Sequence, residues 1–128
     1  VPVQVGRRSD TLAEISAETK SMIERARQKR LQPNEYTGAT FAISNLGMFD
    51  VDNFIALLMP PQAASIAVGA IRDVPVVTKG IVTAGRRMKV TLSCDHRALD
   101  GLMGAQFLKE FKRVLEHPQE LVAPVVKP

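Results

Sequence analysis

The sequence is poor in cysteine and in long apolar runs, and both shortages narrow the class of protein. It has one cysteine among 128 residues, which excludes an internal disulfide framework and fits a reducing compartment. No apolar run approaches the roughly 20 residues that a membrane-spanning helix needs. We therefore expect no membrane partner.

Sequence patterns that carry several common chemistries are also missing. The histidine, cysteine and carboxylate side chains show no metal-ligand spacing, and no glycine-rich phosphate-binding loop occurs. The Gly-x-Ser-x-Gly elbow of serine hydrolases is absent around Ser44. We therefore expect no bound metal.

The charge of the chain permits anionic partners without identifying one. The net charge is +4 and the pI is about 9.6. A basic cluster between Arg25 and Arg30 could be a nucleic-acid patch, but cations at the C-terminal end of a helix explain it more simply. We expect no nucleic-acid partner. Residues 1–5 show neither a starting Met nor the regions of a signal peptide, which favours a piece of a longer chain.

The spacing of apolar residues predicts a mixture of helices and strands. It predicts helices over residues 10–30 and 101–116, the first capped by Ser9 or Asp10. Alternating or continuous apolar runs predict strands over residues 39–44, 63–71, 74–77, 80–84 and 88–94, with a hairpin joining the last two. Residues 51–58 are ambiguous, and a weak strand is possible in residues 1–5. The order favours an α+β fold, a two-layer sandwich of mixed β-sheet and helices.

The stretch from Thr91 to Gly101 is the strongest candidate for a functional site. An apolar strand delivers His96 to its end, and Asp100 follows four residues later, before a predicted helix. His96 is the side chain best able to exchange a proton near neutral pH. Asp100 could orient the imidazole, bind Arg97, or only cap the helix, and these roles stay open.

Three further side chains near this stretch or elsewhere in the chain could have a functional or structural role. Ser44 ends a predicted central strand, and its hydroxyl could donate to a developing oxyanion in the same cleft; the alternative is a buried serine bonded to backbone. Cys94 could be a nucleophile, although a free cysteine is usually a small buried apolar side chain. His117, beside Pro118, is interpreted as a C-terminal helix cap.

Three sequence blocks resemble one known family. Residues 95–101 resemble the Asp-His-Arg-x-x-Asp-Gly signature of the dihydrolipoamide acyltransferases, the E2 components of 2-oxo acid dehydrogenase complexes. Residues 40–49 and 59–63 resemble two further blocks of the family, in the expected order. The Asn-Leu-Gly-Met-Phe segment is most similar to that of the acetyltransferases of pyruvate dehydrogenase complexes.

The resemblance implies a fold and a mechanism. The family fold is similar to that of chloramphenicol acetyltransferase. By resemblance, His96 is the general base that takes the proton from the coenzyme A thiol, and Ser44 stabilises the tetrahedral oxyanion. Asp100 holds the active-site loop through an arginine of the earlier half of the domain, not through Arg97. An acetyl group then moves between coenzyme A and a lipoyl group carried on a separate domain.

The resemblance also implies partners and a partial domain. Complete domains of the family are longer, so residues 1–128 are expected to be the C-terminal part of the catalytic domain. Family members form homotrimers that build a larger core, with the histidine and serine of one site from neighbouring subunits. They work with lipoyl domains and the E1 and E3 components, in the mitochondrial matrix or bacterial cytoplasm. Alternatives are a non-catalytic assembly fragment, a succinyl or branched-chain acyltransferase, and a hydrolase using Ser44 or Cys94.

Overall fold

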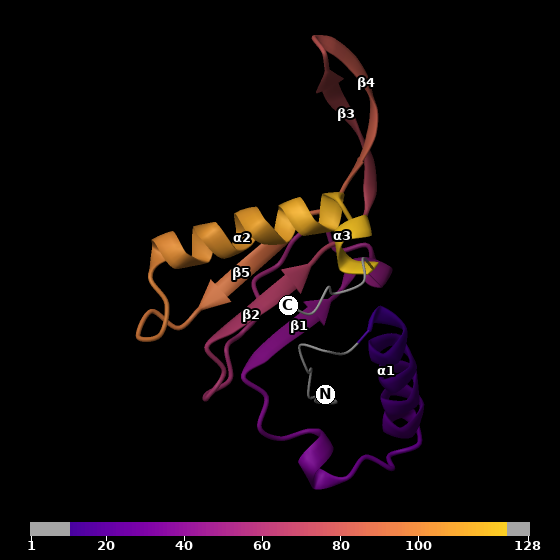
Figure 1. Cartoon of the computed structure of the whole chain (residues 1–128), viewed down its shortest axis with the longest axis vertical. Helices are drawn as coiled ribbons and strands as arrows, with labels where there is room; N and C mark the ends of the chain where they lie inside the picture. The colour runs from indigo at the N-terminus through magenta and orange to yellow at the C-terminus, as the bar shows by residue number, and fades with distance from the viewer. Residues whose placement is uncertain (1–10, 123–128) are drawn as a thin grey trace, which may run out of the picture. The chain divides into compact units, whose positions relative to one another are not determined.

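The computed structural model describes residues 11–122, and Figure 1 shows the order of the helices and strands. In chain order these are α1 (Leu12–Arg27), η1 (Pro33–Glu35), β1 (Phe41–Asn45), η2 (Gly47–Phe49), β2 (Ala64–Val68), β3 (Arg72–Thr78), β4 (Ile81–Arg87), β5 (Val90–Cys94), α2 (Gly101–Glu116) and α3 (Gln119–Val122). The possible strand in residues 1–5 and the expected caps Ser9 and Asp10 lie outside the described residues. Thr40–Gly104 form one compact unit, and the described residues on either side form a second.

The first helix begins with a capping box rather than with the predicted cap. Thr11 Oγ1 accepts the backbone N–H of Glu14 at 3.2 Å, and the Glu14 carboxylate accepts the backbone N–H of Thr11 at 2.6 Å. This reciprocal pair satisfies two donors that a helix start leaves free. The helix ends at Arg27, earlier than predicted, and Lys29 has a left-handed φ of 55°.

A three-stranded mixed sheet forms the centre of the Thr40–Gly104 unit. Its order is β1-β2-β5, with β1 parallel to β2 and β5 antiparallel to β2. The central strand β2 is buried, and Ile66 is only 1% exposed. The small residues of this strand are buried along almost its whole length. A nearly continuous apolar sequence predicts this burial for a strand that is covered on both faces.

The remaining two strands form a separate hairpin, which differs from the predicted pairing. β3 pairs with β4, whereas β5 joins β2, so the expected hairpin between residues 80–84 and 88–94 is wrong. Lys79 and Gly80 have φ values of 51° and 78°, which suit the two-residue turn between twisted strands. Gly85 lies within β4 rather than in a turn. A Cβ at this position would lie 2.6 Å from a Val76 methyl carbon, so the glycine leaves room for that side chain. Figure 1 shows this hairpin extending away from the three-stranded sheet.

Two segments that the sequence left ambiguous or unassigned have defined positions. Residues 51–59 form neither helix nor strand, and the carbonyl of Ala56 accepts Ser93 Oγ–H at 2.9 Å. At the end of α2, the His117 ring Nδ1 lies 2.9 Å from the carbonyl oxygen of Arg113, which confirms its position at the helix C-terminus. The short helix α3 follows, which the sequence did not predict.

The observed elements confirm the α+β class. Among residues 11–122, none of the helices has the length and apolar content that crossing a bilayer requires.

Candidate active site

His96 lies on a turn that follows directly after β5. The backbone N–H of Asp95 donates to the carbonyl of Ala63 at 2.9 Å, which ties the turn to the strand beside it. The carbonyl of Asp95 accepts the N–H groups of Ala98 at 2.9 Å and Leu99 at 3.0 Å. His96 itself is exposed, and its ring makes no hydrogen bond within residues 11–122. The backbone at His96 is therefore held in place, while the imidazole is exposed to solvent.

The residues on either side of His96 bind each other. Arg97 Nη2 donates to Asp95 Oδ2 at 2.7 Å, and Arg97 Nε donates to Asp95 Oδ1 at 3.0 Å. The backbone N–H of Arg97 also donates to Oδ1 at 3.0 Å. Hydrogen bonds from Arg97 lower the pKa of Asp95 to about 2, and the carboxylate raises the pKa of Arg97. Arg97 is thus engaged by Asp95 and does not reach Asp100.

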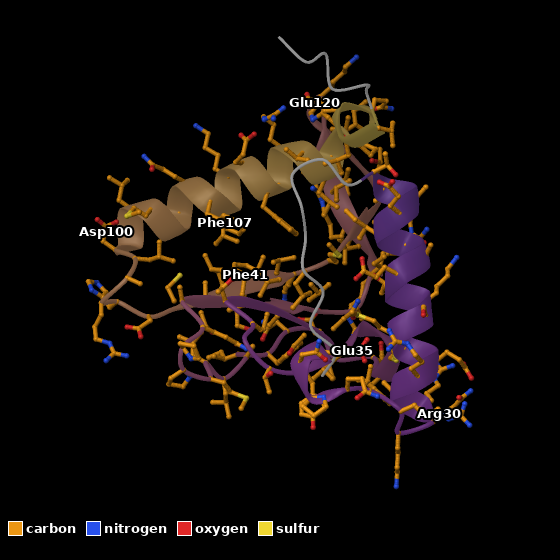
Figure 2. The ribbon with its side chains drawn as sticks, turned by 60° about the horizontal axis from the view of Figure 1, so that its bottom comes forward. Arg30, Glu35, Phe41, Asp100, Phe107 and Glu120 are labelled. Carbon is orange, nitrogen blue, oxygen red and sulfur yellow. The ribbon has the colours of Figure 1, made fainter. Side chains whose placement is uncertain are left out.

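Asp100 caps the helix that follows the histidine turn. Its Oδ1 accepts the backbone N–H of Met103 at 2.8 Å, and Figure 2 shows Asp100 at the N-terminal end of α2. An aspartate at this position satisfies a free helix donor and complements the positive end of the helix dipole. Within the described part of the chain, Asp100 makes no hydrogen bond or ion pair with His96 or Arg97, so of its three possible local roles the structure shows the cap.

Ser44 lies at the other end of the sheet from His96. It registers with Ala67 of β2, which in turn registers with Thr91 near the beginning of β5. Cys94 is three residues further along β5, roughly 10 Å away along the strand, and β1 and β5 are two strand spacings of about 4.8 Å apart. His96 follows two residues after Cys94. Within one chain, therefore, the structure does not place Ser44 and His96 in a common cleft, contrary to the sequence-based expectation.

The Ser44 hydroxyl is half-buried and has no partner among the described residues. No hydrogen bond from its side chain to any part of residues 11–122 is present. The alternative interpretation, a strand serine bonded to nearby backbone, is therefore not what the structure shows. The hydroxyl keeps its donor capacity.

Cys94 has a packing role rather than the geometry of a nucleophile. It ends β5 opposite Ala64, and a Cβ placed on Gly104 would lie 3.6 Å from its Sγ. The sulfur therefore faces the first turn of α2, where a glycine leaves room for it. Since β5 ends at Cys94, strand alternation no longer places His96 on the same face.

A charged cluster that the sequence did not reveal fixes the segment after Ser44. The Asp52 carboxylate accepts hydrogen bonds from Lys89 Nζ at 2.6 Å and Arg72 Nε at 3.2 Å. Arg72 also donates to the carbonyl of Asp50 at 2.8 Å. The hydrogen bond from Lys89 is the main cause of a lowered pKa at Asp52. These partners are 20 and 37 residues apart in sequence, so no local spacing could have predicted them.

Two glycines bring the same segment close to the sheet. A Cβ on Gly69 would lie 2.0 Å from the carbonyl oxygen of Asp52, and a Cβ on Gly47 would lie 2.9 Å from the carbonyl oxygen of Gly69. Backbone hydrogen bonds confirm the contact, since Ala70 N–H donates to the carbonyl of Val51 at 2.8 Å. This end of the sheet therefore has backbone packed directly on backbone.

A surface hollow lies apart from these residues, and residues 11–122 contain no metal cluster. A hollow of about 380 Å³ lies on the β3–β4 hairpin, lined by residues that include Pro75 and Val82, and none of the candidate side chains borders it. No group of three histidine, cysteine, aspartate or glutamate side chains in residues 11–122 could hold a metal ion.

Comparison with known proteins gives a consistent result over most of the chain. Residues 1–123 match the family described as 2-oxoacid dehydrogenases acyltransferase (catalytic domain). The chain is 51% identical over 115 residues to the mitochondrial dihydrolipoyllysine-residue acetyltransferase component of the pyruvate dehydrogenase complex of Schizosaccharomyces pombe, covering 87% of this chain and 24% of the relative. For the corresponding Rhizobium meliloti component the identity is 44%, over 88% of this chain and 25% of the relative.

Solved structures show the same fold. Dihydrolipoamide acetyltransferase of Azotobacter vinelandii superposes with a TM-score of 0.87 at 28% identity, over 94% of this chain and 49% of that one. A serine, a histidine and an asparagine were investigated for their roles in its mechanism. The cubic core of a pyruvate dehydrogenase multienzyme complex gives a TM-score of 0.78 at 29% identity, covering 84% of this chain and 44% of that one. The chain thus spans about a quarter of the length of the curated relatives and about half of these solved chains.

Proposed function

The chain belongs to the 2-oxoacid dehydrogenase acyltransferase family, and from that membership we propose that it is the C-terminal part of the catalytic domain of a dihydrolipoamide acetyltransferase. The proposed reaction moves an acetyl group between dihydrolipoamide and coenzyme A within a pyruvate dehydrogenase complex. The lipoyl group reaches the site on a separate domain, and E1 and E3 components act before and after it. Since the relatives include mitochondrial and bacterial proteins, the matrix or the bacterial cytoplasm is the proposed location.

One observation carries the assignment of the site residues. In the Azotobacter vinelandii enzyme the investigated serine precedes the histidine by 52 residues and the asparagine follows it by four. Ser44, His96 and Asp100 have the same separations in this chain. We assign to them the oxyanion donor, the general base and the residue that holds the histidine turn. The chain has an aspartate where that enzyme has an asparagine, and either residue is a good helix cap.

The exposed imidazole of His96 suits the first step. It accepts the proton of the coenzyme A thiol, and the resulting thiolate attacks the carbonyl carbon of the acetyl-dihydrolipoyl thioester. A thiol ionises readily, so a base as weak as an imidazole is sufficient. The collapse of the tetrahedral intermediate breaks the carbon–sulfur bond to the lipoyl group. The imidazolium then returns its proton to the leaving dihydrolipoyl thiolate.

The oxyanion of that intermediate needs a donor from another copy of the chain. Ser44 and His96 lie at opposite ends of the β1-β2-β5 sheet, so one copy does not supply both. We propose that Ser44 of a neighbouring copy donates to the oxyanion formed beside His96, in a homotrimer that builds a larger core. One solved relative is the cubic core of a pyruvate dehydrogenase multienzyme complex. One hydroxyl donor at an oxyanion contributes about 3 kcal/mol to the transition state.

Asp100 keeps one carboxylate oxygen available for a further partner. Oδ1 is bound to the N–H of Met103, while Oδ2 accepts no hydrogen bond from residues 11–122. An arginine from the earlier half of the domain, as the family resemblance implies, would bind there and join the turn to the rest of the site.

A transfer assay with acetyl-coenzyme A and dihydrolipoamide tests the proposal. The full-length assembled protein should form acetyl-dihydrolipoamide, and His96→Ala should abolish the transfer while the assembly stays intact. Assembly without any transfer by the unmodified protein would instead favour a non-catalytic core fragment. Release of acetate without a thiol acceptor would favour a hydrolase. Faster transfer of succinyl or branched acyl groups would reassign the substrate.

A further inference from the structure

Asp95 and Arg97 are bonded to each other across the backbone of His96. The backbone N–H of Arg97 donates to Asp95 Oδ1 at 3.0 Å, which closes a turn through the aspartate side chain that mimics a β-turn. The guanidinium adds a second link, with Nε–H to Oδ1 at 3.0 Å and Nη2–H to Oδ2 at 2.7 Å. His96 is the central residue of this closed turn. Its backbone angles are therefore restrained from both sides.

The two members of the pair differ in how they are anchored. The Asp95 side chain is 26% exposed, and its backbone N–H and C=O bind Ala63, Ala98 and Leu99. The Arg97 side chain is 85% exposed and makes hydrogen bonds to Asp95 alone among the described residues. Asp95 is thus fixed to the sheet, and Arg97 closes over it from the solvent side.

Stability does not account for this arrangement. Exposed ion pairs contribute little to the free energy of unfolding. A guanidinium that donates two parallel N–H groups to one carboxylate instead provides a defined geometry, which a lysine cannot reproduce. The geometry acts on the one residue between the partners. The steps of the proposed reaction use neither Asp95 nor Arg97.

We propose that Asp95 and Arg97 form a positioning pair that sets the direction of the His96 imidazole toward the thiol. This inference rests on the proposed function, because it concerns the base of that reaction. Neither residue touches the substrate. Both act through the backbone of His96, since a displacement of the base by about 1 Å can cost 100-fold in rate.

Two substitutions of Arg97 in the full-length assembled protein test the pair, with a substitution of Arg113 as control. Arg97→Gln should lower kcat for acetyl transfer by about 10- to 100-fold, while KM for coenzyme A stays unchanged and the unfolding temperature changes little. Arg97→Lys should recover only part of kcat, because an ammonium replaces the fork with a single point contact. Arg113→Gln is the matched control, since Arg113 binds Glu110 and Glu120 with similar geometry on α2 and α3. It should leave both kinetic constants unchanged.

The outcomes separate this inference from the proposed function. A raised KM for coenzyme A with unchanged kcat would show that Arg97 binds substrate, and would overturn the positioning role. An unchanged kcat in Arg97→Gln would overturn it as well. If the unmodified protein transfers no acetyl group, or His96→Ala transfers at the normal rate, the proposed function fails and the inference fails with it. If acetyl transfer is lost in His96→Ala but keeps its normal rate in Arg97→Gln, the positioning role of the pair is overturned and the proposed function stands.

Discussion

Ser44 and His96 lie at opposite ends of one sheet, and the chain holds the two ends by different means. At the His96 end, polar side chains do the holding: Asp95 binds Arg97, and Asp100 caps α2. At the Ser44 end, backbone packs on backbone, with Gly69 too close to the carbonyl of Asp52 for any side chain.

This difference determines what a substitution should change. Exposed side-chain contacts add little to the free energy of unfolding, so changes near His96 should alter activity more than stability. Tight backbone contacts have no room for added atoms, so changes near Gly69 should alter stability first. Substitutions at the two ends should therefore differ in whether they change activity or the free energy of unfolding.

The largest expected effect on activity is that of His96→Ala. Removing the general base should lower the rate of acetyl transfer by about 100- to 10,000-fold, with no change in unfolding temperature, because the side chain makes no hydrogen bond within the described residues. His117→Ala is the matched control, since the His117 ring binds the carbonyl of Arg113 at the end of α2. It should keep full activity. An unfolding temperature that falls in His96→Ala would remove the contrast between the two ends.

The largest expected effect on stability is that of Gly69→Ala. The new Cβ would lie 2.0 Å from a backbone oxygen, and such overpacking should lower the free energy of unfolding by about 3 kcal/mol. Denaturant titration measures the change. Gly101→Ala is the control, because a Cβ at Gly101 meets nothing within 4 Å. Equal stability of the two variants would contradict the packing described at the Ser44 end.

The sequence predicted these two ends unequally. The strand leading to His96 and the helix after Asp100 follow from local patterns of a few residues, and both were predicted. The cap between them was one of the roles left open for Asp100. The cluster of Asp52, Arg72 and Lys89 was missed, because its members meet only after the strands pair. The hairpin was misassigned for a related reason: Gly85 resembles a turn residue, but its role is to make room for Val76.

A smaller effect is expected at Asp100. Comparing the Ala and Asn substitutions of this residue separates the contribution of its helix-capping hydrogen bond from that of its negative charge. Asp100→Ala removes the acceptor for Met103 N–H and should lower the free energy of unfolding by about 1 kcal/mol. Asp100→Asn keeps an acceptor and should leave stability nearly unchanged. Thermal unfolding of the two variants measures both. A loss in Asn as large as that in Ala would show that charge, not capping, is the contribution of Asp100.

The smallest expected effect is the pH dependence of the Asp95–Arg97 pair. The pKa of Asp95 is lowered from 3.8 to about 2 by hydrogen bonds from Arg97. Its contribution to stability is therefore full above pH 3.8 and is lost as the pH falls through about 2. The difference in unfolding temperature between the unmodified chain and Asp95→Asn should shrink across this interval. A difference that stays constant down to pH 2 would show that the ion pair adds no stability.

The sequence identified His96, Asp100 and Ser44 as candidates, and their spacing supports the proposed roles. The residues alone left a single cleft within one chain open, whereas the family resemblance implied that neighbouring subunits share the site. Spacing along a sequence carries no information on strand register, so it could not decide between the two. Only the register of β1 on β2 and of β2 on β5 shows that the serine and the histidine point to different ends.

Co-assembly of two inactive full-length variants tests most directly whether one site takes its residues from two copies. Ser44→Ala and His96→Ala are each expected to be strongly impaired when assembled alone. Unfolded and refolded together in equal amounts, they should recover transfer at about a quarter of the sites, where an intact histidine meets an intact serine from the neighbouring copy in the closed ring. Co-assembled cores that stay as inactive as the separate variants would contradict the account.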